Sequence, residues 1–461
     1  MAVLAERPRP RAIRDHPHAG WFAVATVCFG AFMGQLDASI VTLTFPSLQA
    51  EFAHPLAAVE WVSLSYLLGV VGLLAAAGRL ADAAGRKLMY IWGFAVFTAA
   101  SMACGLAPGL GWLIGFRVVQ ALGAAMLQAN SVALVVGSVP RAKMRAALGV
   151  QAAAQALGLA LGPAVGGLLV SSVGWRWVFL VNAPVGVLGL VAGRFLLPRT
   201  RQRTPLGRFD TAGLVILAAG STALLLALSG ISGLHLPGWL AALLAAVAVL
   251  AVVAFRWRER RTASPLVDLA VLRPATVSLG LVGALCGYLV LFGPLALFPQ
   301  VLGSRGAAGL VLTCLPAGFG FAAVGASRLL PRGLGTRARA VLGSGVCVVG
   351  CALLPVAPGA AAVVGPLLLL VGVGLGVFIP ANNSSIMGAI PERMSATGGG
   401  LVNMARGLGT ALGVALVTLS LHLGGGASGH GDELALFGLA LVAVVAGATG
   451  FAVTTSRSGR E

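Results

Sequence analysis

Long apolar runs, each of roughly 20 residues, recur along the whole chain and alternate with short polar segments that are mostly basic. A run of this length is long enough for a helix to cross a bilayer. Within hydrocarbon, only helices and closed barrels satisfy all of their backbone hydrogen-bonding groups. The runs are rich in Leu, Ala, Val and Gly and lack the two-residue alternation of a barrel strand. The pattern therefore predicts an all-α integral membrane protein.

Fourteen spans result when each apolar run is assigned to one helix. Because fourteen is an even number, both ends of the chain are predicted on the same side of the membrane. The predicted spans are residues 21–43, 59–77, 88–106, 110–139, 146–170, 178–197, 211–231, 238–256, 277–302, 309–330, 340–356, 363–388, 395–421 and 434–453.

The distribution of Lys and Arg tests this arrangement. With the N-terminus inside, 27 of the 31 Lys and Arg fall in inner segments, and only Arg176 and Arg305 fall in outer ones. The remaining two, Arg117 and Arg406, lie within predicted helices. Cytoplasmic loops of membrane proteins carry an excess of Lys and Arg, and one missed helix would scramble this partition. We therefore expect both termini to be cytoplasmic.

The formal net charge of +18 would by itself suggest a nucleic-acid partner. However, only 10% of the residues are charged, against roughly 25% in soluble proteins, and they form short clusters between apolar runs. We therefore predict no nucleic-acid partner. The first apolar run, which begins at Trp21, is too long for a cleavable signal peptide and predicts an uncleaved first helix. The six cysteines lie within apolar runs and form no metal-binding spacing.

The sequence contains none of the common catalytic motifs. It has no Gly-Lys dipeptide and therefore no phosphate-binding P-loop, no HExxH zinc motif, and no GxSxG with plausible partners. We predict a secondary transporter and not an enzyme. Its transport would be driven by something other than ATP bound to this chain, without a cofactor or a metal.

Two fragments recur at nearly the same offset along the chain. LGLALG (157–162) is echoed by LGTALG (408–413), and GRLA (78–81) is echoed by SRLL (327–330). Two related halves with a solute site between them are a common plan for transporters. The predicted organisation is a cytoplasmic arm (1–20), an N-terminal six-helix bundle (21–197), a linker with two inserted helices (198–273), a C-terminal six-helix bundle (274–455) and a cytoplasmic tail (456–461).

Charged residues inside predicted spans are the first candidates for function, because a charge in the bilayer is costly. Asp37 is the single acid well inside a span, and an embedded carboxylate marks a proton or ion path or bonds to neighbouring helices. Glu60, at the outer mouth of the second span, is a second candidate for proton coupling. Arg117 and Arg406 either anchor the fold or take part in coupling and binding.

Five motifs resemble those of the major facilitator superfamily, in its fourteen-helix drug:proton antiporter branch. They occur in order and at matching positions along nearly the whole chain. They are LDASIV (36–41) with FP (45–46), GRLADAAGRK (78–87), RVVQALG (117–123), the run of glycines around Gly162-Pro163 (158–167), and WRWVF (175–179) with NAP (182–184).

The resemblance implies a major facilitator fold and a role for each motif. Asp37 would be the protonation site, and Arg117 would influence the proton relay. A latch at the inner gate would consist of Gly78, Asp82, Gly85 and Arg86. An antiporter motif that bends and closely packs the fifth helix would consist of Gly158, Gly162, Pro163 and Gly166.

The chain also departs from the family pattern. Ala83 stands where the family usually has Arg, and the second half has no membrane-embedded carboxylate. The missing carboxylate argues against a dicationic substrate. The predicted substrate pocket consists of polar or aromatic residues in core spans, namely Phe32, Met33, Gln35, Gln128, Asn130, Asn182, Tyr288, Phe292, Asn382, Asn383, Asn403 and Arg406.

Together these features predict a proton-coupled exporter of amphipathic drugs, antibiotics or secondary metabolites. It would work as a monomer by alternating access in a bacterial cell membrane, with protons and lipid as its other partners. Two alternatives remain open. One is proton-coupled import of a nutrient or siderophore-like solute, against which the Gly-Pro pattern of the fifth span argues. The other is a non-transporting sensor or lipid-handling protein on the same fold.

Overall fold

The computed structural model describes residues 8–140, 143–200, 210–231, 234, 236–262, 269–302, 306–329, 331, 334–356, 361–390, 395–425 and 430–458. Within these ranges every regular element is a helix, as the apolar pattern predicts. The first seven residues of the predicted arm and the last three of the predicted tail lie outside the described residues. So do residues 201–209, 232–233, 235 and 263–268 of the predicted linker between the halves.

The long helices follow the predicted spans closely. They are α2 (Ala19–Ile40), α5 (Trp61–Ala84), α6 (Arg86–Gly105), α7 (Leu110–Val136), α8 (Met144–Ser172), α10 (Asn182–Leu196), α11 (Thr211–Ile231), α12 (Gly238–Glu259), α13 (Ala275–Leu302), α14 (Gly306–Leu329), α15 (Thr336–Leu353), α16 (Ala361–Ala389), α17 (Ser395–Leu423) and α18 (Gly431–Ser458).

Among the described residues, thirteen helical segments are long and apolar enough to cross a membrane. The one remaining predicted span, residues 309–330, corresponds to α14, which contains the shorter apolar stretch Gly309–Ala323. The structure is therefore consistent with fourteen spans and with a multi-pass membrane protein.

Short helices connect the spans. The helix α1 (Arg11–Arg14) precedes α2, and the 3-10 helix η2 (Val41–Thr44) continues α2 into α3 (Phe45–Phe52). At the outer side, α4 (Leu56–Val59) leads into α5, and α9 (Arg176–Leu180) leads into α10. Two further 3-10 helices are present: η4 (Leu269–Leu272) precedes α13, and η5 (Leu354–Val356) follows α15.

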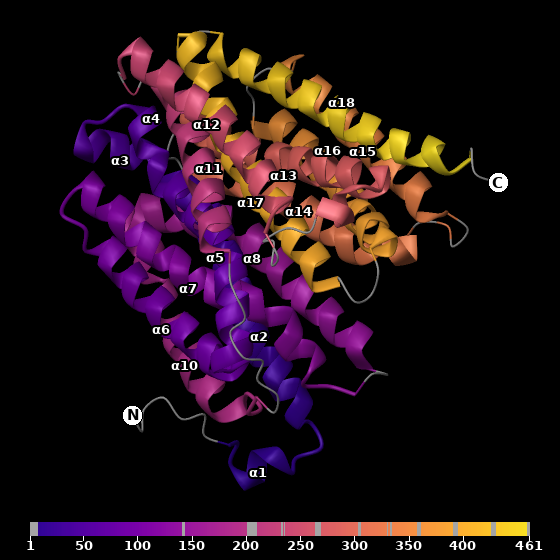
Figure 1. The fold of residues 1–461 in the computed structure, drawn as a ribbon. Helices are drawn as coiled ribbons and strands as arrows, with labels where there is room; N and C mark the ends of the chain where they lie inside the picture. Colours follow the sequence, from indigo (N-terminus) through magenta and orange to yellow (C-terminus); the bar gives the residue numbers. More distant parts are fainter. Residues whose placement is uncertain are drawn as a thin grey trace.

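The long helices form two groups in Figure 1, one coloured indigo to magenta and one orange to yellow. In the first group, α2 packs on α8, α7 lies against both α5 and α6, and α10 contacts α2 and α6. In the second group, α13 packs on α17 and α18, while α16 lies against α14 and α15. The groups meet where α8 packs on α14 and where α5 packs on α17.

The helices α11 and α12 pack mainly against each other. Of the two, α11 also contacts α5 of the first group and α17 of the second, whereas most residues of α12 face away from the protein. This placement is compatible with an inserted pair beside the two bundles. The exact domain bounds remain a prediction.

The predicted loop at residues 78–87 is shorter in the structure than the sequence suggests. The helix α5 continues through Gly78 to Ala84, and the chain turns only at Gly85. The backbone of Gly85 has φ 115° and ψ 128°, a conformation that residues with a side chain rarely adopt. Ala and Leu favour helix, so the helix continues until glycine permits the turn.

The repeated fragments LGLALG and LGTALG occupy equivalent contacts in the two groups. A Cβ atom on Gly158 of α8 would collide with the carbonyl oxygen of Phe32 on α2. Likewise, a Cβ on Gly409 of α17 would collide with the carbonyl oxygen of Leu285 on α13. In each group, glycine therefore allows two backbones to approach closely, as small residues do in membrane helix pairs.

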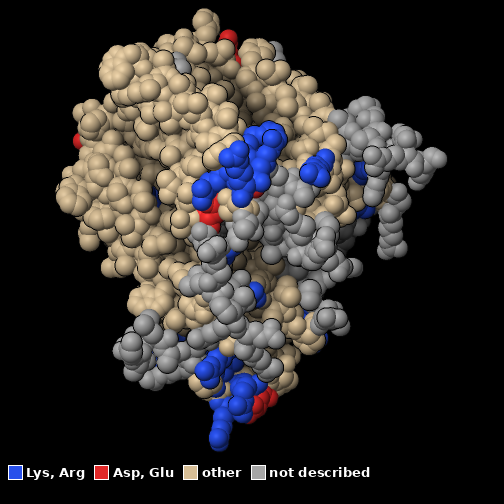
Figure 2. Space-filling model, in the orientation of Figure 1, with Lys and Arg blue, Asp and Glu red and all other residues tan. Residues whose placement is uncertain are grey.

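The charged side chains are unevenly distributed over the surface. In Figure 2 the upper-left face is almost entirely uncharged, whereas basic side chains gather near the centre and at the bottom. The described basic residues include Arg11 and Arg14 of the N-terminal arm and Arg256 and Arg258 at the end of α12. All four belong to segments that the positive-inside rule places in the cytoplasm.

Candidate functional site

An ion pair between Asp37 and Arg117 lies at the centre of the first bundle. Asp37 comes from α2 and Arg117 from α7, and both side chains are fully buried. The Arg117 Nη1 atom lies 2.6 Å from Asp37 Oδ2. Each charge is costly to bury alone, and the pairing offsets part of the cost of moving both out of water. Asp37 and Arg117, the two charged residues deepest within predicted spans of the first half, are therefore direct partners.

Neutral polar side chains complete the surroundings of Asp37. Gln120 Nε2 donates to Asp37 Oδ1 at 2.9 Å, and Asn182 Nδ2 donates to the same oxygen at 3.2 Å. Ser101 accepts hydrogen bonds from both amides, at 3.2 and 3.0 Å. Because Asp37 accepts from every described partner, the geometry suits its ionised form. We call Asp37, Arg117, Gln120, Asn182 and Ser101 the Asp37 cluster.

Arg117 also makes contacts beyond this cluster. Its Nε donates to the backbone carbonyl of Val62 at 2.8 Å, and Nη1 also donates to Gln120 Oε1 at 2.7 Å. Its guanidinium stacks on the ring of Tyr66, 4.1 Å from the ring centroid. Nη2 is buried without a hydrogen-bond partner among the described residues. Loss of the Asp37 charge would therefore leave a buried cation with few compensating groups.

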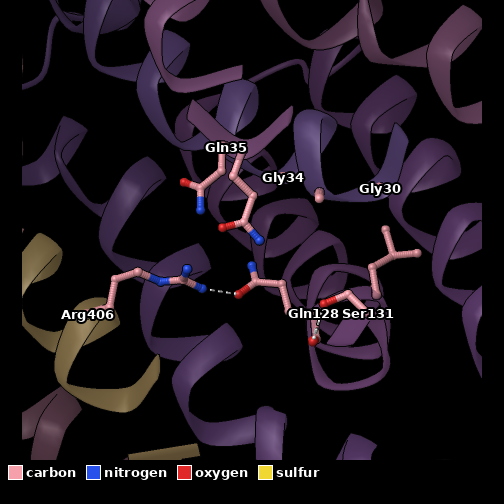
Figure 3. Close-up of a pocket in the computed structure, with 9 residues that line it drawn as sticks. Gly30, Gly34, Gln35, Gln128, Ser131 and Arg406 are labelled. Carbon is pink, nitrogen blue, oxygen red and sulfur yellow. Dashed lines mark hydrogen bonds between the residues drawn. The ribbon is translucent and has the colours of Figure 1, made fainter. Parts of the chain in front are cut away.

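Two adjoining cavities lie between the bundles. Gly34, Gln35, Gln128 and Arg406 line both of them. Arg406 Nη2 donates to Gln128 Oε1 at 2.7 Å, which links α17 of the second bundle to α7 of the first. Figure 3 shows Arg406 reaching toward Gln128 from the opposite bundle, with Gln35 directed toward the same space. We call this space the central cavity.

Five of the residues predicted to bind substrate line the central cavity. They are Gln35, Gln128, Phe292, Asn403 and Arg406. A sixth, Tyr288, lies beside the Arg406 side chain. The remaining apolar lining comes mainly from α5, with Leu67, Val70, Val71 and Leu74, and Tyr66 also contributes. Tyr66 therefore separates the central cavity from Arg117.

The other predicted pocket residues occupy different places. Met33 is fully buried in the core, and Phe32 lies on α2 against Gly158. Asn130 donates to Met126 O of its own helix at 2.7 Å, and Asn382 donates to Gly280 O of α13 at 2.7 Å. Asn182 belongs to the Asp37 cluster. Asn383 has a buried Oδ1 without a hydrogen-bond partner among the described residues. None of these six lines the two cavities described above.

Glu60 is fully buried at the outer side, at the junction of three parts of the protein. The Ser229 hydroxyl of α11 donates to Glu60 Oε1 at 2.6 Å, and Trp61 Nε1 donates to the Ser229 hydroxyl at 3.1 Å. Thr418 of α17 lies within hydrogen-bonding reach of the same carboxyl group. Glu60 therefore ties the first bundle to the second and to the inserted pair. The outer ends of α5, α11 and α17 therefore meet at Glu60.

Replacing Glu60 with Leu should lower the thermal stability of the purified protein, because it removes the acceptor of the buried Ser229 hydroxyl. The expected loss is about 1–3 kcal/mol, the usual cost of stranding a buried polar group. A thiol-reactive dye that reports exposure of the buried cysteines would follow unfolding. Glu60→Gln, which keeps an oxygen for Ser229 and gains a donor for Thr418, should retain most of the stability. Equal melting temperatures for Glu60→Leu and the wild type would contradict this role.

The residues of the predicted inner-gate latch lie around the junction of α5 and α6. Gly78 lies near the end of α5, Gly85 forms the turn, and Arg86 begins α6. The side chain of Asp82 lies outside the described residues, so its contacts in the predicted latch remain open.

The antiporter motif uses two faces of α8. Gly158, Gly162 and Gly166 face α2, where added Cβ atoms would meet Phe32, Ser39 and Ile40 respectively. On another face, the Pro163 carbonyl oxygen would lie 2.5 Å from a Cβ atom on Gly309 of α14. The motif therefore packs α8 against its own bundle and against the opposite one.

Sequence reasoning did not include Ser101, Gln120 or Tyr66 among the site residues. Gln120 lies one helical turn after Arg117, so its shared face with Arg117 was a usable signal. Ser101 and Tyr66 are isolated polar residues in apolar spans, and sequence alone does not distinguish such residues from helix-packing contacts.

Comparison with known sequences identifies the family. The model of the Major Facilitator Superfamily matches residues 27–414. A relative from Klebsiella pneumoniae subsp. pneumoniae, named as the multidrug resistance protein MdtD, is 32% identical over 433 residues, covering 89% of this chain and 88% of the relative. The MdtD protein of Cronobacter sakazakii is 33% identical over 426 residues, with coverage of 88% and 86%.

Solved structures of membrane transporters share the fold of this chain. A mutant of the peptide transporter POT, crystallised in complex with sulfate, aligns with a TM-score of 0.71 at 16% identity, covering 98% of this chain and 97% of that one. A bacterial homologue of the human lysosomal transporter Spinster, in an inward-facing and unoccupied conformation, aligns with a TM-score of 0.65 at 14% identity, covering 95% and 98%. At these identities the similarity concerns the fold alone.

The helices, the motifs and the relatives converge on one class of protein. The chain is a multi-pass protein of the bacterial inner membrane and a secondary transporter, not an enzyme. It belongs to the Major Facilitator Superfamily, in the fourteen-helix drug:proton antiporter branch that includes its multidrug resistance relatives.

Proposed function

We propose that this multidrug transporter exports amphipathic compounds in exchange for protons, with Asp37 as the protonation site. The observation that carries the proposal is the buried Asp37–Arg117 pair. In it, the Asp37 carboxylate acts only as a hydrogen-bond acceptor toward its described partners. A proton arriving at Asp37 neutralises the carboxylate and weakens this pair. Arg117 is then a buried cation without its counter-charge, which costs several kcal/mol, of the order of 3–5.

This cost supplies the drive for a conformational change. Arg117 contacts Tyr66, and Tyr66 lines the central cavity beside residues that join the two bundles. A shift of Arg117 on protonation therefore changes the wall of the cavity where substrate binds. Release of the proton restores the ion pair and resets the cavity. Proton binding and substrate binding are coupled through this shared wall, as reciprocal linkage requires.

Export is favoured over import by the resemblance of the Gly-Pro run in α8 to the antiporter motif. Its Gly-Pro motif lies against both α2 and α14, so the fifth span can act as a close-packed element between the bundles. The relatives named for multidrug resistance support the same direction.

Everted membrane vesicles containing the protein test this proposal. With a respiration-generated acidic lumen, at least one of three fluorescent amphiphiles (pyrenebutyrate, pyrenebutanol or pyrenebutyl-trimethylammonium) should accumulate above the level in vesicles lacking the protein. Addition of the same compound should partly dissipate the pH gradient, because protons leave in exchange. A protonophore should remove the accumulation. Accumulation that persists with the protonophore would contradict proton coupling.

A further inference from the structure

The electrostatic character of the central cavity points to the charge of the substrate. Arg406 is the one charged residue among the described residues that line the two cavities. The other polar lining residues include the amides Gln35, Gln128, Gln155 and Asn403, which carry no charge. The lining therefore presents a single positive charge among neutral polar groups.

No described acid balances this charge. Asp37 is an embedded carboxylate next in sequence to Ala38, which lines the cavity. However, Asp37 is already paired with Arg117 and accepts hydrogen bonds from Gln120 and Asn182. Glu60 is bonded to Ser229 at the outer end. An unpaired cation within the membrane region is costly, so a negatively charged ligand would be stabilised there.

Arg406 also has the hydrogen-bonding capacity for such a ligand. A guanidinium carries five N–H donors in a planar fork, and the described acceptors of Arg406 are Gln128 Oε1, bound by Nη2, and the nearby Tyr288 hydroxyl, which leaves further N–H groups for a ligand. A carboxylate or sulfonate matches the remaining fork with two parallel hydrogen bonds. In Figure 3 the guanidinium extends into the space between the bundles instead of lying along its own helix.

The rest of the cavity suits an apolar body. Leu67, Val71 and Phe292 lie on its wall with Tyr66, and these side chains exclude water around a ring system. An acidic group at Arg406 and an aromatic or aliphatic body against α5 would occupy the two chemically different parts of the cavity when it widens during alternating access.

We infer that the central cavity binds amphipathic anions, compounds with one carboxylate or sulfonate and an apolar body, through a salt bridge to Arg406. The inference rests on the proposed transport function and names its substrate class. Because Arg406 also bonds Gln128 across the two bundles, the anion competes for or shares the donor group that joins them. Binding of the anion therefore acts directly on the contact between α17 and α7.

Binding of two matched probes to the purified protein tests the inference. Pyrenebutyrate and pyrenebutanol share one body and differ in the acidic group, and energy transfer from protein tryptophans measures their affinity. Wild type should bind the butyrate at least tenfold more tightly than the alcohol. Arg406→Gln should reduce butyrate affinity at least tenfold and change alcohol affinity less than twofold. Arg406→Lys should recover part of the butyrate affinity.

Arg176→Gln is the control, because it removes one positive charge from the exposed outer surface, where Arg176 pairs with Glu51. It should leave both affinities unchanged. The inference is overturned if wild type does not prefer the butyrate, if pyrenebutyl-trimethylammonium binds more tightly than the butyrate, or if Arg406→Gln keeps the preference. Both probes are measured at equilibrium, at one pH and without a gradient, so these outcomes do not depend on whether the protein carries out proton-driven transport.

Discussion

Replacing Asp37 with Asn should reduce proton-driven accumulation in everted vesicles to the level of vesicles lacking the protein. Asn has nearly the shape of Asp and retains an oxygen that can accept from Arg117, but it cannot take up or release a proton. The variant therefore removes the chemistry while preserving most of the geometry. Counterflow exchange of substrate, which needs no net proton movement, should persist.

The variant also leaves Arg117 buried without a negative partner, so loss of folding must be separated from loss of coupling. The double variant Asp37→Asn with Arg117→Gln removes both charges at once and avoids an uncompensated buried cation. We expect the double variant to melt at a higher temperature than Asp37→Asn alone, while still failing to accumulate substrate with a gradient. Wild-type proton-driven accumulation in Asp37→Asn would refute the proposed protonation site.

Replacing Gly158 with Ala should destabilise the protein by about 1–3 kcal/mol or prevent its insertion as a folded protein, since overpacking of a tight core has costs of this size. The added Cβ would collide with the carbonyl oxygen of Phe32 and lie 3.1 Å from its carbonyl carbon. Because backbone atoms of α2 stand in the way, rotation of a side chain cannot relieve the contact. Yield of folded protein and melting temperature in detergent measure the effect.

Gly115→Ala on α7 is a matched control, since nothing lies within 4 Å of its added Cβ. It should leave the melting temperature unchanged or raise it, because Ala favours helix over Gly. Gly409→Ala should resemble Gly158→Ala, as it meets the Leu285 carbonyl oxygen in the equivalent pair of the second bundle. If Gly158→Ala and Gly115→Ala behaved alike, close backbone packing would not be the reason for glycine at position 158.

The extent of the helices could be predicted closely from sequence because bilayer insertion depends on the length of local apolar runs. The bounds 211–231 agree with α11, and most other helix ends differ by a few residues. The largest difference is at residues 78–84, where a family motif was assigned to a loop although Ala and Leu continue the helix to Gly85. A turn needs a residue that can adopt its conformation, and in this segment Gly85 does so.

The candidate site could be predicted in part. Asp37 and Arg117 were identifiable as embedded charges, since each is conspicuous in an apolar run. Their direct pairing, and the roles of Gln120 and Ser101 beside them, required the structure. Likewise, Asn130 and Asn182 were both candidates for the pocket, yet one bonds its own helix and the other bonds Asp37.

The sequence by itself determined which segments cross the membrane, which side they begin on, and which charges are left within the bilayer, because these depend on local hydrophobicity and on the placement of Lys and Arg. The tertiary structure decided which side chains meet. Membrane helices are apolar on the lipid side and the protein side alike, so their sequences carry little information about rotation around the helix axis. Packing through Gly158 and its counterparts sets that rotation. It thereby directs Asp37 toward Arg117 and Arg406 into the central cavity.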